Sequence, residues 1–102
     1  MQKKYFIPVE EFKERITKTQ QAMRLKDIDL LLAFSTESEP AHVRYYADYW
    51  PSFETTAVLI PADGEPTLLI GPECLTVATA RSKIKKIVQL IDFRESSQPE
   101  YP

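Results

Sequence analysis

The sequence predicts an α/β fold in which helices flank a mixed β-sheet. An amphipathic stretch near the N-terminus precedes an uninterrupted apolar run, Leu30-Leu31-Leu32-Ala33-Phe34. Two more apolar runs then lie on either side of an Asp63-Gly64 pair, and a second amphipathic stretch separates them from a last apolar segment. The resulting order, α-β-(α)-β-β-α-β, is typical of a mixed sheet with helices packed against its faces.

The N-terminal part is expected to form a helix over residues 8–26 and a strand over residues 29–35. Pro8 suits the first helical position, because its missing N–H would be unpaired there. The apolar side chains of the helix fall on one narrow stripe, with Thr19 among them: Val9, Phe12, Ile16 and Met23. The apolar run of the strand shows no alternation, so we expect it to be covered on both faces.

The remaining elements follow in short succession. They are a short helix carrying residues 42–47, strands over 55–60 and 67–70, a helix over 72–83 and a strand over 87–93. The Asp63-Gly64 pair supplies the positive φ that a chain reversal needs, so the two middle strands should form an antiparallel hairpin. Cys74, Val77 and Ala78 are expected on the inward face of the last helix.

A chain of 102 residues forms one domain or part of one. We place this domain at residues 1–93 and interpret residues 94–102, which are polar and contain two prolines, as a tail or linker. With about four strands and no closing helix, we expect the sequence to stop before its domain is complete.

Composition excludes several classes of protein. The formal net charge is −2, and the densest basic group, Lys83, Lys85 and Lys86, is interpreted as a solvated helix end, so nucleic acid is not an expected partner. No apolar run approaches the roughly 20 residues of a membrane span, so no membrane partner is expected either. The single cysteine, Cys74, excludes an internal disulfide and suits the reducing cytoplasm.

Residues that could carry catalysis or hold a metal are sparse. One histidine and one cysteine, far apart in the sequence, do not make a zinc site, and the acidic residues are interpreted as solvated surface. No strained nucleophile turn of the G-x-S-x-G type is present, and the two glycines are too few for a phosphate-binding loop. We therefore predict no catalytic residue, no metal ligand and no cofactor within these residues.

An aromatic segment is the one candidate for binding. Five of the eleven aromatic residues lie between Tyr45 and Phe53, next to His42 and Arg44. They either fill a small core or form the wall of a binding site. Trp50 is expected to point outward, because the following proline ends the element, and Arg44 could clamp a carboxylate.

In these segments the chain resembles the N-terminal domain of the creatinase/prolidase/aminopeptidase P family, the "pita-bread" metallopeptidases that cut Xaa-Pro bonds. The resemblance spans roughly residues 8–93. It rests on the order and spacing of these motifs: Glu11-Phe12-Lys13-Glu14-Arg15, Met23, Asp29-Leu30-Leu31-Leu32-Ala33, His42-Val43-Arg44-Tyr45-Tyr46-Ala47-Asp48-Tyr49 and Pro61-Ala62-Asp63-Gly64-Glu65-Pro66. Asp48 stands where the family has glycine, and Asp tolerates positive φ better than most residues.

The resemblance implies a ribonuclease H-like sheet motif and a non-catalytic role. Two divalent ions, manganese, cobalt or zinc, would be held by an absent catalytic domain, where a metal-bridged hydroxide attacks the carbonyl before proline. The implied partners are that catalytic domain, a second subunit in a homodimer and, for the full-length protein, an Xaa-Pro peptide. Carried over by position, the substrate-wall candidates are His42, Arg44, Tyr45 and Trp50.

Two alternatives remain open. The chain could be a stand-alone α/β binding module that recognises a peptide or small molecule through the aromatic segment. It could instead be a fragment of a creatinase-like amidinohydrolase. The sequence does not distinguish dipeptides from longer substrates, and it does not identify the metal or the oligomeric state.

Overall fold

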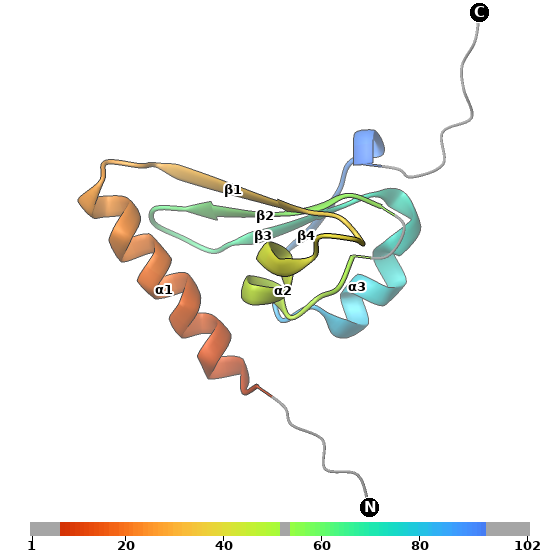
Figure 1. Cartoon of the computed structure of the whole chain (residues 1–102), viewed down its shortest axis with the longest axis horizontal. Coiled ribbons are helices and arrows are strands. Elements are labelled where there is room, and N and C mark those ends of the chain that lie inside the picture. Colours follow the sequence, from red (N-terminus) through yellow and green to blue (C-terminus); the bar gives the residue numbers. More distant parts are fainter. Residues whose placement is uncertain (1–6, 52–53, 94–102) are drawn as a thin grey trace, which may run out of the picture.

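The computed structural model describes residues 7–51 and 54–93, in which four strands form one mixed sheet (Figure 1). The spatial order follows the sequence: β1 (Leu30–Ser35), β2 (Thr56–Pro61), β3 (Thr67–Ile70) and β4 (Ile87–Gln89). Strand β2 pairs antiparallel with both β1 and β3, and β4 runs parallel to β3. The mixed α/β class is confirmed, as is the antiparallel hairpin. The predicted tail at 94–102 and Phe53 lie outside the described residues.

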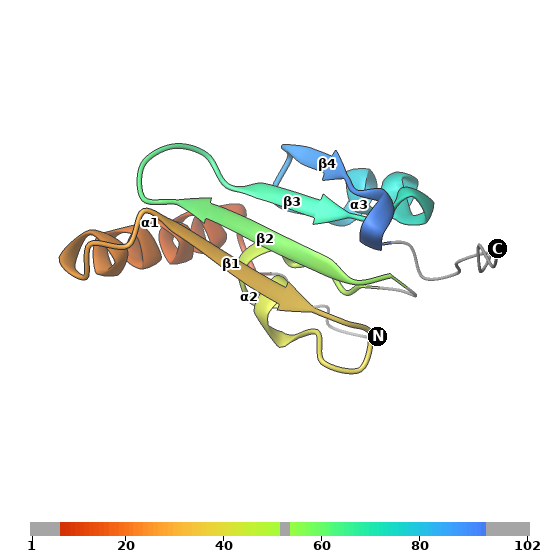
Figure 2. The same cartoon turned by 90° about the horizontal axis from the view of Figure 1, so that it is seen from above.

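Three α-helices lie on one side of this sheet (Figures 1 and 2). They are α1 (Val9–Leu25), α2 (Ala41–Ala47) and α3 (Leu75–Arg81). Short 3₁₀ turns precede α3, at η1 (Pro72–Cys74), and follow β4, at η2 (Ile91–Phe93). Between the helices and the sheet lies one core. The sheet contributes Val58, Ile60, Leu68 and Ile70, and the helices contribute Ile16, Met23, Val43, Ala47 and Ala78.

The opposite face of the sheet is apolar and largely open, which corrects the expectation that the first strand is covered on both faces. Leu30, Leu32 and Phe34 are 55%, 44% and 50% exposed. Successive side chains of a strand point to opposite faces, and the three described helices cover only the face to which Leu31 points. Val88 of β4 is exposed as well. Val88 pairs with Leu69, Leu69 pairs with Ala57, and Ala57 pairs with Phe34. Because directly paired residues point to the same face of a sheet, Val88 lies on the open face with Phe34.

The C-terminal elements are shorter than the sequence predicts. The helix expected over residues 72–83 begins as the 3₁₀ turn η1 and ends at Arg81. Cys74 and Ala78 are buried as expected, but Val77 is exposed, because the short helix presents only a narrow face to the core. The strand expected over 87–93 ends at Gln89, and the chain turns into η2.

Two backbone positions with positive φ close turns as expected. Gly64, in the connection between β2 and β3, has a φ of 116°. Asp48 adopts the left-handed conformation directly after α2, with φ 54° and ψ 37°. Aspartate tolerates this region better than most residues, so the helix ends at this position without a glycine. The turn directs the chain from α2 into the aromatic residues that follow.

Candidate functional site

The aromatic segment is split between the core and the surface. It starts at α2, whose Val43 N–H donates to Ser35 Oγ at the end of β1 over 3.0 Å. Tyr49 is buried at 1% exposure, whereas Tyr45 and Trp50 are 49% and 53% exposed. Both interpretations of the sequence therefore apply, each to different residues. Trp50 points outward, as expected.

Trp50 forms an ordered surface platform with Arg44. The Trp50 Nε1–H donates to the Glu37 carbonyl over 3.1 Å, which holds the indole over the loop between β1 and α2. The Arg44 guanidinium carbon lies 4.6 Å from the centroid of the Trp50 ring, in cation–π geometry. Within the described residues no carboxylate pairs with Arg44. The platform therefore offers a charged fork and an aromatic surface to an incoming group.

Tyr45 takes part in a different arrangement. The Arg15 guanidinium carbon of α1 lies 4.4 Å from the centroid of the Tyr45 ring and 4.8 Å from that of Phe12. Arg15 Nη1 also donates to the Tyr45 carbonyl over 2.8 Å, and its Nε donates to the Glu11 carboxylate over 3.2 Å. The contacts between Arg15 and Tyr45 thus hold α2 against α1. The sequence did not predict this role for Arg15.

His42 lies apart from Arg44. It is exposed and lines a shallow hollow with Tyr46 along the edge of β1. Residues two apart on a helix point about 200° apart, so α2 directs His42 and Arg44 to different sides. Of the four sequence candidates, the structure brings together Arg44 and Trp50, while His42 and Tyr45 each contact other neighbours.

A buried polar group also involves this segment, and no local sequence pattern predicts it. Tyr49, Glu54 and Cys74 are all buried, although they come from separate parts of the chain. Burial raises the pKa of the Tyr49 hydroxyl, and the neighbouring Cys74 and Glu54 raise it further. Burial also raises the pKa of the Cys74 thiol, and its interaction with Glu54 adds to this effect. Both groups are therefore held in their neutral forms.

Gly71 makes room for the Glu54 carboxylate. A Cβ atom at residue 71 would run into that carboxylate, so only glycine fits there. Glu54 Oε2 accepts the Glu73 backbone N–H over 3.1 Å and so holds the start of η1. Glu54 therefore positions the connection between β3 and α3, and the group presents no reactive side chain to solvent.

The basic residues 83, 85 and 86 do not form the expected helix end. Helix α3 stops at Arg81, and these lysines lie on the connection to β4. Lys83 is half-buried and its Nζ lies 3.4 Å from Asp48 Oδ2. The connection forms a wall of a groove beside α1, on the helical side of the molecule.

Residues 7–51 and 54–93 contain no group of three or more His, Cys, Asp or Glu side chains placed to hold a metal ion. In the same residues, none of the helices is both long enough and apolar enough to cross a membrane.

The chain is similar to one known protein family and to several solved structures. The family described as the creatinase/prolidase N-terminal domain matches residues 15–101. No curated protein matches the chain. Among solved structures, the N-terminal domain of the cytoplasmic peptidase PepQ from Mycobacterium tuberculosis aligns with a TM-score of 0.67 and 18% identity, over 78% of this chain and 58% of that one.

Two further structures share the fold. An Xaa-Pro aminopeptidase from Streptococcus pyogenes aligns with a TM-score of 0.65 and 19% identity, over 82% of this chain and 60% of that one. Dipeptidase PepE from Mycobacterium ulcerans gives a TM-score of 0.68 and 15% identity, over 84% of this chain but only 24% of that one. The chain thus spans less than two thirds of each of these three structures.

Proposed function

The chain belongs to the creatinase/prolidase N-terminal domain family, and we propose that it is the non-catalytic N-terminal domain of a metal-dependent Xaa-Pro dipeptidase or aminopeptidase. The family match over residues 15–101 carries this proposal. The likeness to a dipeptidase and to an Xaa-Pro aminopeptidase supports the class of activity. Such bonds need dedicated enzymes, because proline lacks an N–H and has a fixed φ.

The catalytic apparatus is proposed to lie on other polypeptide. The described residues offer no set of ligands for a metal ion, so they do not fit the two divalent ions, manganese, cobalt or zinc, that the family implies. In this proposal a separate catalytic domain holds those ions. Residues 1–93 form the accessory domain, and residues 94–102 lead toward the catalytic domain. A cytoplasmic location agrees with the single cysteine, which is buried and does not form a disulfide.

The open face of the sheet supports a role in assembly. Leu30, Leu32 and Phe34 of β1 and Val88 of β4 are all between 41% and 55% exposed. Contiguous exposed apolar surface of this kind marks an interaction site in soluble proteins. We propose that the chain's own catalytic domain and a second subunit of a homodimer are its partners, and that this face contributes to the contact.

The Arg44–Trp50 platform is the proposed wall of the active site. Arg44 can pair with the carboxylate of a substrate, since no described carboxylate occupies it. Trp50 provides a rigid aromatic surface that excludes water and limits the length of the substrate. His42 and Tyr45 are also proposed as substrate-wall residues, although each contacts other neighbours than the platform.

The proposal is tested by comparing the 102-residue chain with the product of the complete reading frame. We expect manganese-dependent release of proline from Xaa-Pro dipeptides by the complete protein and none by the chain alone. The reading frame beyond residue 102 should then encode two Asp, one His and two Glu ligands in that order. Robust turnover by the pure chain would refute the accessory role. A reading frame that stops soon after residue 102 would favour a stand-alone binding module, and hydrolysis of creatine instead of Xaa-Pro peptides would indicate an amidinohydrolase.

A further inference from the structure

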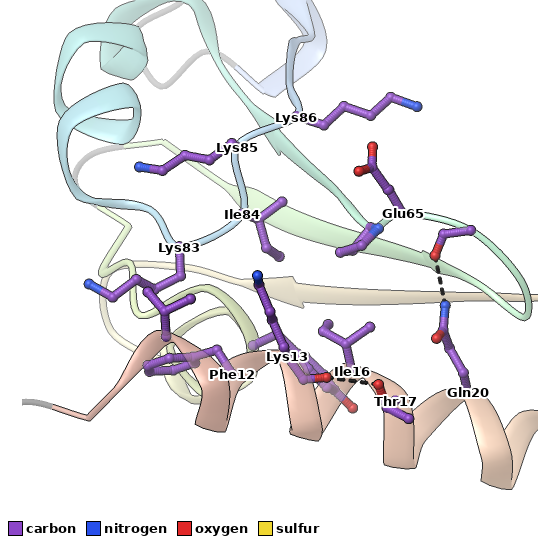
Figure 3. Close-up of a pocket in the computed structure, with 14 residues that line it drawn as sticks. Phe12, Lys13, Ile16, Thr17, Gln20, Glu65, Lys83, Ile84, Lys85 and Lys86 are labelled. Carbon is purple, nitrogen blue, oxygen red and sulfur yellow. Dashed lines mark hydrogen bonds between the residues drawn. The ribbon is translucent and has the colours of Figure 1, made fainter.

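A groove with a lysine rim lies beside α1, on the helical side of the sheet (Figure 3). We call it the lysine groove; it runs between α1, the turn between β2 and β3, and residues 83–86, with a volume of about 420 Å³. Its floor is apolar and includes the buried side chains of Phe12, Ile16 and Ile84. Its rim carries four lysines: Lys13, Lys83, Lys85 and Lys86.

One wall of the lysine groove is fixed by a buried amide. Gln20 of α1 is 8% exposed, and its Nε2 donates to the carbonyls of Pro61 and Gly64, each over 2.9 Å. These two bonds hold the turn between β2 and β3 against the helix; the dashed line from Gln20 in Figure 3 marks one of them. The spacing between α1 and the turn is therefore set before any ligand arrives.

The opposite wall, which carries three of the lysines, is fixed as well. Ser82 is fully buried; its Oγ donates to the Ile84 carbonyl over 2.8 Å and accepts the Ile84 N–H over 3.0 Å. The Lys86 carbonyl accepts the Leu68 N–H over 2.8 Å, which ties this segment to β3. A preformed site loses little conformational entropy when it binds, so this geometry favours recognition.

The lysine groove concentrates positive charge on a chain whose formal net charge is −2. Lys83 is paired with Asp48. Among residues 7–51 and 54–93, no carboxylate forms an ion pair with Lys13, Lys85 or Lys86. Figure 3 shows Lys13 projecting from α1 toward the segment that carries the other lysines. Glu65 is the single acidic residue among those described that line the groove.

We propose that the lysine groove binds an acidic polypeptide segment that carries an apolar side chain. The apolar floor takes that side chain, and the unpaired ammonium groups pair with flanking carboxylates, so charge and polarity are both complementary. Three lysines without an ion pair are too few to follow a nucleic acid backbone. This inference is independent of the proposed peptidase role.

The test measures fluorescence anisotropy of a labelled peptide of alternating glutamate and leucine, titrated with the 102-residue chain. We expect saturable binding that weakens as salt is raised. Combining Lys13→Gln, Lys85→Gln and Lys86→Gln should weaken binding about eightfold, because each exposed ion pair contributes a factor of about two. Replacing leucine by serine in the peptide should weaken binding by a similar factor.

A matched triple variant serves as the control. Lys18→Gln, Arg24→Gln and Lys26→Gln remove the same charge from exposed positions of the same helix region, outside the lysine groove. This variant should bind like the unmodified chain, and both triple variants should keep its thermal melting. The proposal is overturned if the two triples weaken binding equally, if the serine peptide binds as well as the leucine peptide, or if no binding occurs. Stronger, groove-dependent binding of an oligonucleotide or of anionic vesicles would also overturn it.

Discussion

Trp50 and Tyr49 are adjacent aromatic residues in opposite environments. Tyr49 is 1% exposed within the core, and Trp50 is 53% exposed over the loop after β1. The left-handed turn at Asp48 sets the direction of the chain after α2, and so the direction of both side chains. A sequence pattern places both residues in one aromatic segment, but the turn decides which of them is core.

Trp50→Ala should therefore cost less than about 1 kcal/mol of unfolding free energy, whereas Tyr49→Ala should cost about 3–5 kcal/mol, as for a buried aromatic residue. Urea denaturation of the two variants checks this difference. In the complete enzyme, Trp50→Ala should change kcat/KM for Xaa-Pro substrates without lowering the melting temperature appreciably. A large loss of stability in Trp50→Ala would mean that this side chain is structural and not a wall of the site.

The side chain of Arg15 joins helices α1 and α2. The Arg15 side chain is 18% exposed, lies between the rings of Phe12 and Tyr45, and donates to the Tyr45 carbonyl. A charged hydrogen bond of this kind contributes more than a neutral one, and the two ring contacts add to it. The packing of α1 onto the rest of the fold thus depends on Arg15 as well as on the apolar stripe.

Arg15→Ala should lower the free energy of unfolding by about 2 kcal/mol, measured by urea denaturation. Arg15→Lys should recover only part of this loss, because lysine keeps the charge but not the planar fork. Lys18→Ala, which removes an exposed pair with Glu14 on the same helix, is the control and should cost less than about 0.5 kcal/mol. Equal losses for Arg15→Ala and Lys18→Ala would contradict the proposed bridge.

Most elements could be located from the sequence, because local signals specify them. The proline before α1, the apolar run of β1 and the Asp63-Gly64 turn each act within a few residues. The lengths of the last helix and the last strand were overestimated. For the strand the reason is that a short apolar run does not show where its hydrogen-bonding partner ends. Strand β4 pairs with β3 through only three residues, after which the chain turns into η2.

The whole molecule has one covered and one open face. All three described α-helices pack on one side of the sheet, so large apolar side chains of β1 and β4 remain exposed on the other (Figures 1 and 2). Strand β1 is also an edge strand of the four-stranded sheet, and exposed edges favour pairing with further polypeptide. The chain alone should therefore associate with itself through this face.

We expect the sedimentation coefficient of the chain to rise with concentration and Leu32→Glu to suppress this rise. The free energy of unfolding of the Leu32→Glu variant should differ little from that of the unmodified chain, because Leu32 is 44% exposed. Val77→Glu is the matched control: Val77 is also 44% exposed, but it lies on α3, on the helical side. If both variants suppress association equally, the effect comes from added charge rather than from the open face.

The candidate site was only partly accessible to sequence reasoning. The exposure of Trp50 followed from local signals, but its pairing with Arg44 depends on how the chain turns at Asp48. The bridge formed by Arg15 joins residues 30 positions apart, and the group of Tyr49, Glu54 and Cys74 comes from three segments. No local pattern marks such contacts.

The sequence by itself determined the family, the order of the elements and the turns, because these depend on residue types at short spacings. Tertiary structure alone decided which face of β1 is open, which tyrosines of the aromatic segment are buried and which lysines gather around one groove. These properties depend on side chains that are distant in the sequence and meet only when the sheet assembles. An apolar run specifies a strand, but only its neighbours in space determine how many of its faces are covered.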